Sequence, residues 1–224
     1  MKKSILFIIC ICSLVFTGCG YDNYDEPEST LSGKIVYEGN PVGVRTNAVR
    51  LDIWQDGYAV KKSFTAYIAH DGTYSVTLFD GQYKVVRRGG APWEDQPNDT
   101  IIVNVKNKAV VDIPVKPYFI IKNESFQKGS GTITAKFTID KILASANVAE
   151  VRLYLGKSIL TDQNKNEKAV SATLSTITIG QEATLAAEIP ANLVGQDYLF
   201  ARVGVRSTVS SEFYYTQIQK ISLK

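Results

Sequence analysis

The sequence predicts an all-β protein of two tandem β-sandwich domains, preceded by an N-terminal targeting segment. Short runs of alternating apolar and polar residues are separated by turns rich in Gly, Asn, Asp and Pro. Tyrosine, which favours strands, is the commonest aromatic residue, with 12 copies. Almost no segment has the 3.6-residue period of an amphipathic helix. A chain of 224 residues is long enough for two domains of ordinary size.

Residues 1–18 have the composition of a signal peptide. Two lysines precede an apolar stretch from Ile5 to Phe16, which is too short to span a bilayer. Small residues then precede Cys19, and this arrangement resembles the lipobox of bacterial lipoproteins. The resemblance implies cleavage before Cys19, lipidation of its thiol and anchoring in a membrane. The alternative is an ordinary secretory signal that contains an incidental cysteine.

Residues 19–30 follow as an acidic segment that contains a proline and has too few apolar side chains to fold alone. We interpret it as a flexible tether. It also resembles the signal that sends Bacteroidetes lipoproteins to the outer face of the outer membrane, although a plain solvated spacer is the other interpretation. Because Cys10 and Cys12 leave with the signal, the mature chain keeps no cysteine pair for a disulfide or a metal.

Residues 31–114 are predicted to form the first sandwich. Asp71-Gly72 lies between two alternating runs and is a strong hairpin signal. The expected strands are residues 31–37, 49–53, 64–68, 73–78, 83–87, 100–105 and 109–113.

Residues 115–224 are predicted to form the second sandwich, after a stiff connector bounded by Pro114 and Pro117. Residues 141–150 are expected to include a helical turn, and 162–168 a polar loop. The stretch from Ile189 to Leu193 resembles the strand-joining corner of immunoglobulin- and fibronectin-III-like sandwiches. The expected strands are residues 118–122, 132–139, 151–155, 174–179, 185–188, 198–206 and 214–222.

Several stretches together resemble one family of two-domain Bacteroidetes lipoproteins of unknown function. These stretches are residues 22–27, 31–33, 71–74, 78–84, 99–100 and 115–118. Members are commonly encoded beside SusC/SusD-like outer-membrane glycan-uptake proteins. The resemblance implies a carboxypeptidase regulatory-like, prealbumin-type first domain. The family has no established catalytic residues, so none is transferred to this chain.

The residues give little support for catalysis, and we expect no enzyme and no cofactor. The single histidine, His70, lies in a predicted turn, and no nucleophile elbow, phosphate-binding glycine loop or zinc-ligand pattern is present. Carboxylates beside glycines are better explained by local backbone bonding than by glycoside hydrolysis. The 25 basic and 22 acidic residues nearly balance, which disfavours nucleic acid as a partner.

Three aromatic residues are candidates for glycan binding. Trp54 falls at the end of a predicted strand, Tyr67 points away from the core side of the next strand, and Trp93 lies in a long loop. Aromatic rings stack on the C–H faces of sugars while nearby polar groups bond the hydroxyls. The structural alternative is that Trp54 covers a strand edge and Trp93 plugs the end of the sandwich.

Thr100 is a candidate for O-glycosylation, because Asp99-Thr100-Ile101 resembles the Asp-Thr-aliphatic motif of Bacteroidetes. A plain strand start is the other interpretation. Taken together, the sequence predicts a non-enzymatic outer-membrane surface lipoprotein that binds polysaccharide as an accessory of an uptake system. The alternative is an interaction module that docks SusC/SusD-like or other surface proteins without binding sugar.

Overall fold

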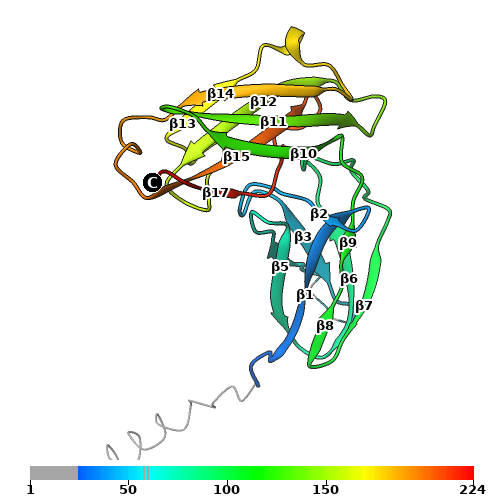
Figure 1. Cartoon of the computed structure of the whole chain (residues 1–224). Coiled ribbons are helices and arrows are strands. Elements are labelled where there is room, and N and C mark those ends of the chain that lie inside the picture. Colours follow the sequence, from blue (N-terminus) through cyan, green and yellow to red (C-terminus); the bar gives the residue numbers. More distant parts are fainter. Residues whose placement is uncertain (1–24, 58, 60) are drawn as a thin grey trace, which may run out of the picture.

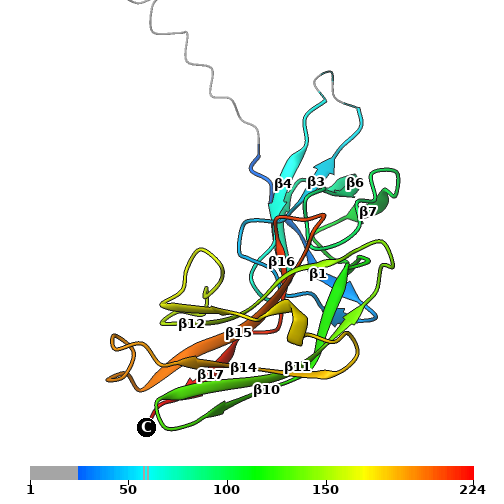
Figure 2. The same ribbon diagram turned by 90° about the horizontal axis from the view of Figure 1, so that it is seen from above.

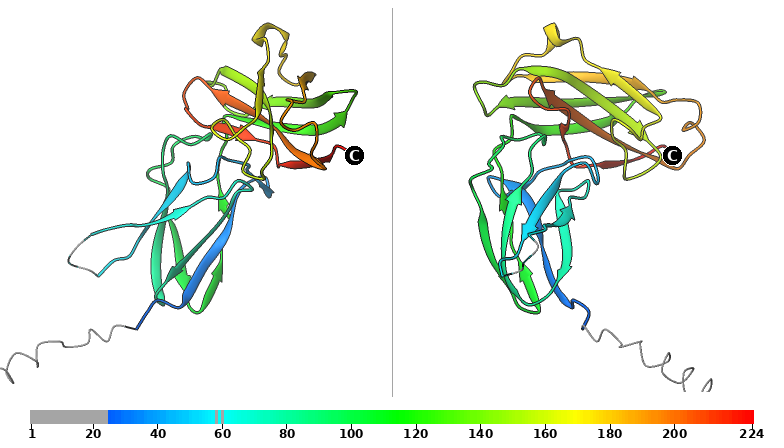
Figure 3. Two further views of the ribbon diagram at one scale, coloured as in Figure 1. Left: turned by 90° about the vertical axis from the view of Figure 1, so that its left-hand side faces the viewer. Right: turned by 180° about the vertical axis from the view of Figure 1, so that it is seen from behind.

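The computed structural model describes residues 25–57, 59 and 61–224, and it contains two β-sandwiches joined at an angle (Figures 1 and 3). The predicted all-β class is confirmed. Within the described residues the helical content is one 3₁₀ turn, Leu174–Thr176. The N-terminal end of the first strand lies at the pole of the first sandwich that is opposite the second domain (Figure 1).

The first sandwich has two sheets. One has the order β2-β1-β5, and β8 and β9 add to β1 in parallel. The other is a four-stranded antiparallel sheet with the order β4-β3-β6-β7. The strands are β1 (Ser29–Tyr37), β2 (Asn40–Pro41), β3 (Arg50–Trp54), β4 (Phe64–Tyr67), β5 (Thr73–Leu78), β6 (Gly81–Arg87), β7 (Ile101–Val105), β8 (Lys108–Val110) and β9 (Ile113–Pro114).

The second sandwich faces a three-stranded sheet, β10-β11-β14, against a sheet built on β12 and β15 (Figure 2). The edge strands of the latter are β13 beside β12, and β16 and β17 beside successive parts of β15. The strands are β10 (Phe119–Lys128), β11 (Thr132–Lys141), β12 (Val148–Gly156), β13 (Lys168–Ser171), β14 (Glu182–Glu188), β15 (Tyr198–Ser207), β16 (Phe213–Tyr215) and β17 (Gln219–Ser222).

Three expectations for the second domain are wrong. Residues 174–179 form no strand, because the Thr176 hydroxyl bonds the Thr173 carbonyl and closes a local turn instead. The expected helical turn within 141–150 is a short loop that leads into β12. The last predicted strand, residues 214–222, is split into β16 and β17. Between them, the Val203 amide donates a hydrogen bond to the Thr216 hydroxyl and not to a backbone carbonyl.

Strand alternation builds the cores. In β3, Leu51 and Ile53 are fully buried, whereas Arg50, Asp52 and Trp54 reach solvent on the other side. Burial of such aliphatic side chains contributes roughly 1.5–3 kcal/mol each. The buried cluster is continuous from the first sandwich into the second.

The two sandwiches meet through the segment Val42–Arg45, which lies against β16. Gly43 forms a β-bridge with Tyr215, whose amide donates to the Gly43 carbonyl at 3.0 Å. A Cβ on Gly43 would lie 2.4 Å from the Tyr215 carbonyl oxygen, so only glycine permits this approach. Arg45 adds an ion pair with Glu212 at 2.5 Å.

Arg202 in β15 is fully buried at this junction. Its guanidinium donates to the carbonyl of Val44 in the first domain at 3.2 Å and to the carbonyl of Thr216 at 3.0 Å. Its Cζ lies 4.0 Å from the centroid of the Tyr215 ring. Burial lowers the pKa of Arg202 to about 10, so the group is still charged at neutral pH. The cation therefore bonds backbone from both domains.

We expect Gly43→Ala to destabilise the protein by about 1–3 kcal/mol, because the added methyl overlaps the Tyr215 backbone and forces the domains apart. Denaturant unfolding measures the loss. Gly195→Ala is the control, since a Cβ at that position meets open space. Equal stability of the two variants would contradict the close approach.

We expect Arg202→Ala to cost about 3–5 kcal/mol, because it opens a cavity and leaves two buried carbonyls without donors. Arg50→Ala, at a half-buried arginine on a sheet surface, should change stability by about 0.5 kcal/mol or less. Thermal and urea unfolding of both variants test this difference. If Arg202→Ala lowered the free energy of unfolding by only about 1 kcal/mol, Arg202 would not be needed to hold the two domains together.

Candidate functional site

The solvent side of the sheet β4-β3-β6-β7 carries two of the three aromatic side chains that the sequence analysis selected, Trp54 and Tyr67. We call this surface the outer face. It is a sheet surface with a pocket of about 230 Å³ at the end formed by Arg50 and Arg88. The ladder registers of β3 with β4 and β6 determine which of its residues are neighbours. The outer face comprises Arg50, Asp52, Trp54, Thr65, Tyr67, Lys84, Arg88 and Ile102.

Trp54 and Tyr67 both lie on the outer face, with exposed fractions of 36% and 49%. Tyr67 is the cross-strand partner of Arg50, and Trp54 lies four residues further along β3. At about 3.3 Å per residue, the two rings are roughly 13 Å apart along the strand. They therefore occupy opposite ends of the face and would contact different units of an extended chain.

Polar groups fill the space between the two rings. Asp52 and Thr65 are a cross-strand pair, and Arg88 donates to the Asp52 carboxylate at 3.0 Å. Lys84 lies opposite Trp54 and pairs with Asp56 at 2.5 Å. The face thus has three basic side chains, of which Lys84 and Arg88 are paired with Asp56 and Asp52, while Arg50 lies beside Tyr67.

Trp93 is not part of this face, and its selection as a sugar-stacking residue is wrong. It is 1% exposed and forms a β-bridge with Pro117. Hydrogen bonds between Glu94 and Lys116 and between Tyr118 and Pro92 hold the loop against the domain connector. The indole fills the end of the first sandwich, as the structural alternative predicted.

Thr100 is exposed and directly precedes β7, where a glycan would have room. The side chain of the preceding residue, Asp99, forms an ion pair with the buried guanidinium of Arg87. This pairing supplies a reason for the aspartate apart from modification. O-glycosylation of Thr100 stays a prediction.

The lipidation residue Cys19 and the signal peptide lie outside the described residues. In the part of the chain that the structure describes, no helix is long and apolar enough to cross a membrane. The tether expected for residues 19–30 is described only from Asp25 onward, and β1 already begins at Ser29.

The carboxylates in the turns of the first domain bond backbone and hydroxyl groups, which are local for Asp71 but distant in sequence for Asp80. Asp71 accepts bonds from the amide and hydroxyl of Thr73, which lower its pKa against the opposing effect of burial. Asp80 accepts from the Asn107 amide and the Ser29 hydroxyl. His70 is half-buried, and desolvation lowers its pKa. Among residues 25–57, 59 and 61–224, no group of three or more His, Cys, Asp or Glu could hold a metal ion.

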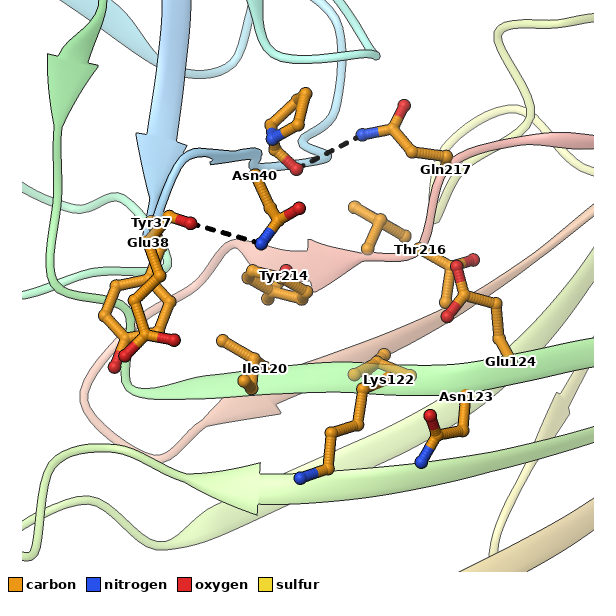
Figure 4. A pocket seen from close by; sticks show the side chains of 13 residues that line it. Tyr37, Glu38, Asn40, Ile120, Lys122, Asn123, Glu124, Tyr214, Thr216 and Gln217 are labelled. Atoms are coloured by element: carbon orange, nitrogen blue, oxygen red, sulfur yellow. Dashed lines mark hydrogen bonds between the residues drawn. The ribbon is translucent and has the colours of Figure 1, made fainter.

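A pocket of about 340 Å³ opens where the two sandwiches meet (Figure 4). Its residues come from the end of β1, the turn that follows and β2, from β10, and from β16 and the two residues after it. None of them was selected from the sequence, because the pocket depends on how the domains dock. The one local signal is Glu38-Gly39, an unusual pair for a tight hairpin turn.

Comparison with known proteins identifies both halves of the chain. Residues 29–116 match the N-terminal domain of a protein family of unknown function, DUF3823, and residues 119–220 match the DUF3823 C-terminal domain, also of unknown function. No curated protein matches the chain.

Solved structures match across 88% of this chain and all of their own length. A DUF3823 protein from Bacteroides ovatus is 50% identical with a TM-score of 0.84. One from Parabacteroides merdae is 31% identical with a TM-score of 0.81. A Bacteroides uniformis protein proposed to bind carbohydrate has a TM-score of 0.73, and its 20% identity shows a shared fold alone. This chain therefore belongs to the DUF3823 family.

Proposed function

We propose that this protein is a non-enzymatic, lipid-anchored surface protein that binds carbohydrate through the outer face. The observation that carries the proposal is the exposure of Trp54 and Tyr67 on one polar sheet surface. A single exposed aromatic residue is common on proteins. Two rings at the ends of one face, with hydrogen-bonding groups between them, match the requirements of an extended glycan.

The binding would combine two kinds of contact. The rings of Trp54 and Tyr67 would stack on the C–H faces of sugar units, which removes apolar surface from water. Asp52 and Arg88 would exchange hydrogen bonds with hydroxyl groups between the rings. Because the face is a solvated sheet surface, we expect weak affinity that increases with the length of the glycan.

The anchor would serve the same function. Two or three acyl chains on Cys19 would hold the protein at a membrane permanently, since each buried methylene contributes about 0.8 kcal/mol. A weak binder fixed near an uptake system keeps polymer close by raising its effective concentration. The fold likeness to a Bacteroides uniformis protein proposed to bind carbohydrate is consistent with this ligand class.

We expect migration of the folded protein to be retarded in native gels that contain a polysaccharide recognised by the outer face. Trp54→Ala and Tyr67→Ala should each weaken the interaction by about 1 kcal/mol, roughly fivefold, through loss of one stacking contact. Phe79→Ala removes an exposed aromatic ring elsewhere on the same domain and is the matched control. Absence of retardation across a broad glycan panel, with a stoichiometric protein partner in detergent extracts, would favour the docking function instead.

We expect Cys19→Ser to move the protein from the membrane fraction to the soluble fraction, because no acyl chain can attach to serine through a thioether. Fractionation of cells that express each form measures this. Protease added to intact cells should degrade the wild-type protein if it faces outward. Retention of the serine variant in the membrane, or full protection from protease, would refute the anchored surface location.

A further inference from the structure

The pocket between the domains is built by side chains from both sandwiches (Figure 4). Tyr37 and Glu38 come from the first domain, and Asn123, Glu124 and Tyr214 come from the second. Its volume of about 340 Å³ lies at the lower end of the range for small-ligand sites. Because its lining comes from both domains, the pocket requires that the contacts between Gly43 and Tyr215, between Arg45 and Glu212, and of Arg202 hold the domains together.

Two residues that line the pocket have left-handed backbone conformations, one in each domain. Glu38 has φ +49° in the two-residue turn between β1 and β2, and Asn123 has φ +53°. Asn123 lies where the register of β10 against β11 shifts, and such bulges re-aim side chains. Asparagine tolerates this conformation, but glutamate at the Glu38 position costs about 1 kcal/mol or more. Glu38 thus destabilises the turn between β1 and β2, where asparagine would fit the backbone conformation better.

Tyr214 contributes to the pocket a hydroxyl that is not among the buried unpartnered atoms of the described residues. The residue is 9% exposed and packs in the core, yet its hydroxyl has no hydrogen-bond partner among the described residues. Burial, with a smaller contribution from Glu124, raises the pKa of Tyr214 to about 12, so the hydroxyl keeps its proton. The Tyr214 hydroxyl is therefore a hydrogen-bond donor in the pocket that is available to a ligand.

The charges select the kind of ligand. The single lysine of the pocket, Lys122, is paired with Asp140. Glu38 and Glu124 have no ion-pair partner in the described chain, so the pocket has an excess of acceptors and negative charge. Anionic ligands are disfavoured, whereas hydroxyl donors can bond these carboxylates. The Tyr37 ring and the Ile120 side chain add apolar surface to the same pocket.

We propose that this pocket is a second carbohydrate site, which takes a compact neutral sugar unit, such as a chain end or branch, between Glu38, Glu124 and Tyr214. The proposal rests on the carbohydrate ligand proposed above but uses a different surface. The outer face would hold an extended polymer, and the pocket would hold one unit with defined orientation. Uronic acids would be excluded by the two carboxylates.

Calorimetric titration with soluble neutral oligosaccharides, and with matching uronate oligosaccharides, tests the site. We expect a neutral oligosaccharide to bind the wild-type protein and the uronates not to bind. Glu38→Asn and Tyr214→Phe should each weaken that binding at least fivefold. Neither change should lower the unfolding temperature, since asparagine suits the turn and the deleted hydroxyl has no partner.

Two controls separate the surfaces. Trp54→Ala alters the outer face and Glu188→Gln alters an exposed carboxylate on β14, so both should bind the oligosaccharide as the wild type does. Oligosaccharide binding that is unaffected by Glu38→Asn and Tyr214→Phe would overturn the pocket site. Polysaccharide retardation without any oligosaccharide binding would also overturn it and leave the outer face intact. Absence of both would overturn both proposals.

Discussion

The arrangement of the two sandwiches depends on a buried cation, Arg202, that forms no ion pair with a carboxylate of the described residues. Arg202 is stabilised by hydrogen bonds to the carbonyls of Val44 and Thr216 and by the face of the Tyr215 ring. A charge removed from water without such groups would be strongly unfavourable. Because the Val44 carbonyl belongs to the first domain, the two terminal nitrogens of the guanidinium both have acceptors only when the domains are docked, while its buried Nε has no partner. Docking and the pairing of these two nitrogens are therefore one event, and the pocket beside the junction depends on it.

Most of the strand pattern of the first domain could be predicted because turns and alternation are local. The strand expected over 109–113 is instead split into β8 and β9, which pair with the distant β1. The turn at Asp71-Gly72 has a carboxylate that bonds Thr73 two residues further on, and the runs on either side of it alternate. The second domain was harder to predict. Residues 174–179 have the composition of a strand, but the hydroxyl of Thr176 forms a competing local bond. The break at Thr216 likewise depends on a side-chain contact with Val203, which no local pattern contains.

The candidate site residues also differ in whether the sequence alone could place them. Strand parity placed Trp54 and Tyr67 on the solvent side, because a residue's face follows from its position in the strand. Trp93 could not be assigned by parity, since it lies in a loop, and its burial results from the bridge to Pro117. The pocket residues come from segments far apart in the chain. Tyr37 and Tyr214 became neighbours only through the contact of Gly43 with Tyr215.

The position of β1 has a mechanical consequence. Its N-terminal end lies at the far pole of the first sandwich, and the strand lies centrally in its sheet, between β5 on one side and β8 and β9 on the other. A force that pulls on this end along the strand acts across the ladder bonds on both sides at the same time. Such bonds are loaded in shear and share the tension, whereas bonds at a peeled edge break one after another. The fold thus resists traction at its N-terminus far better than an arrangement with an edge strand in that place would.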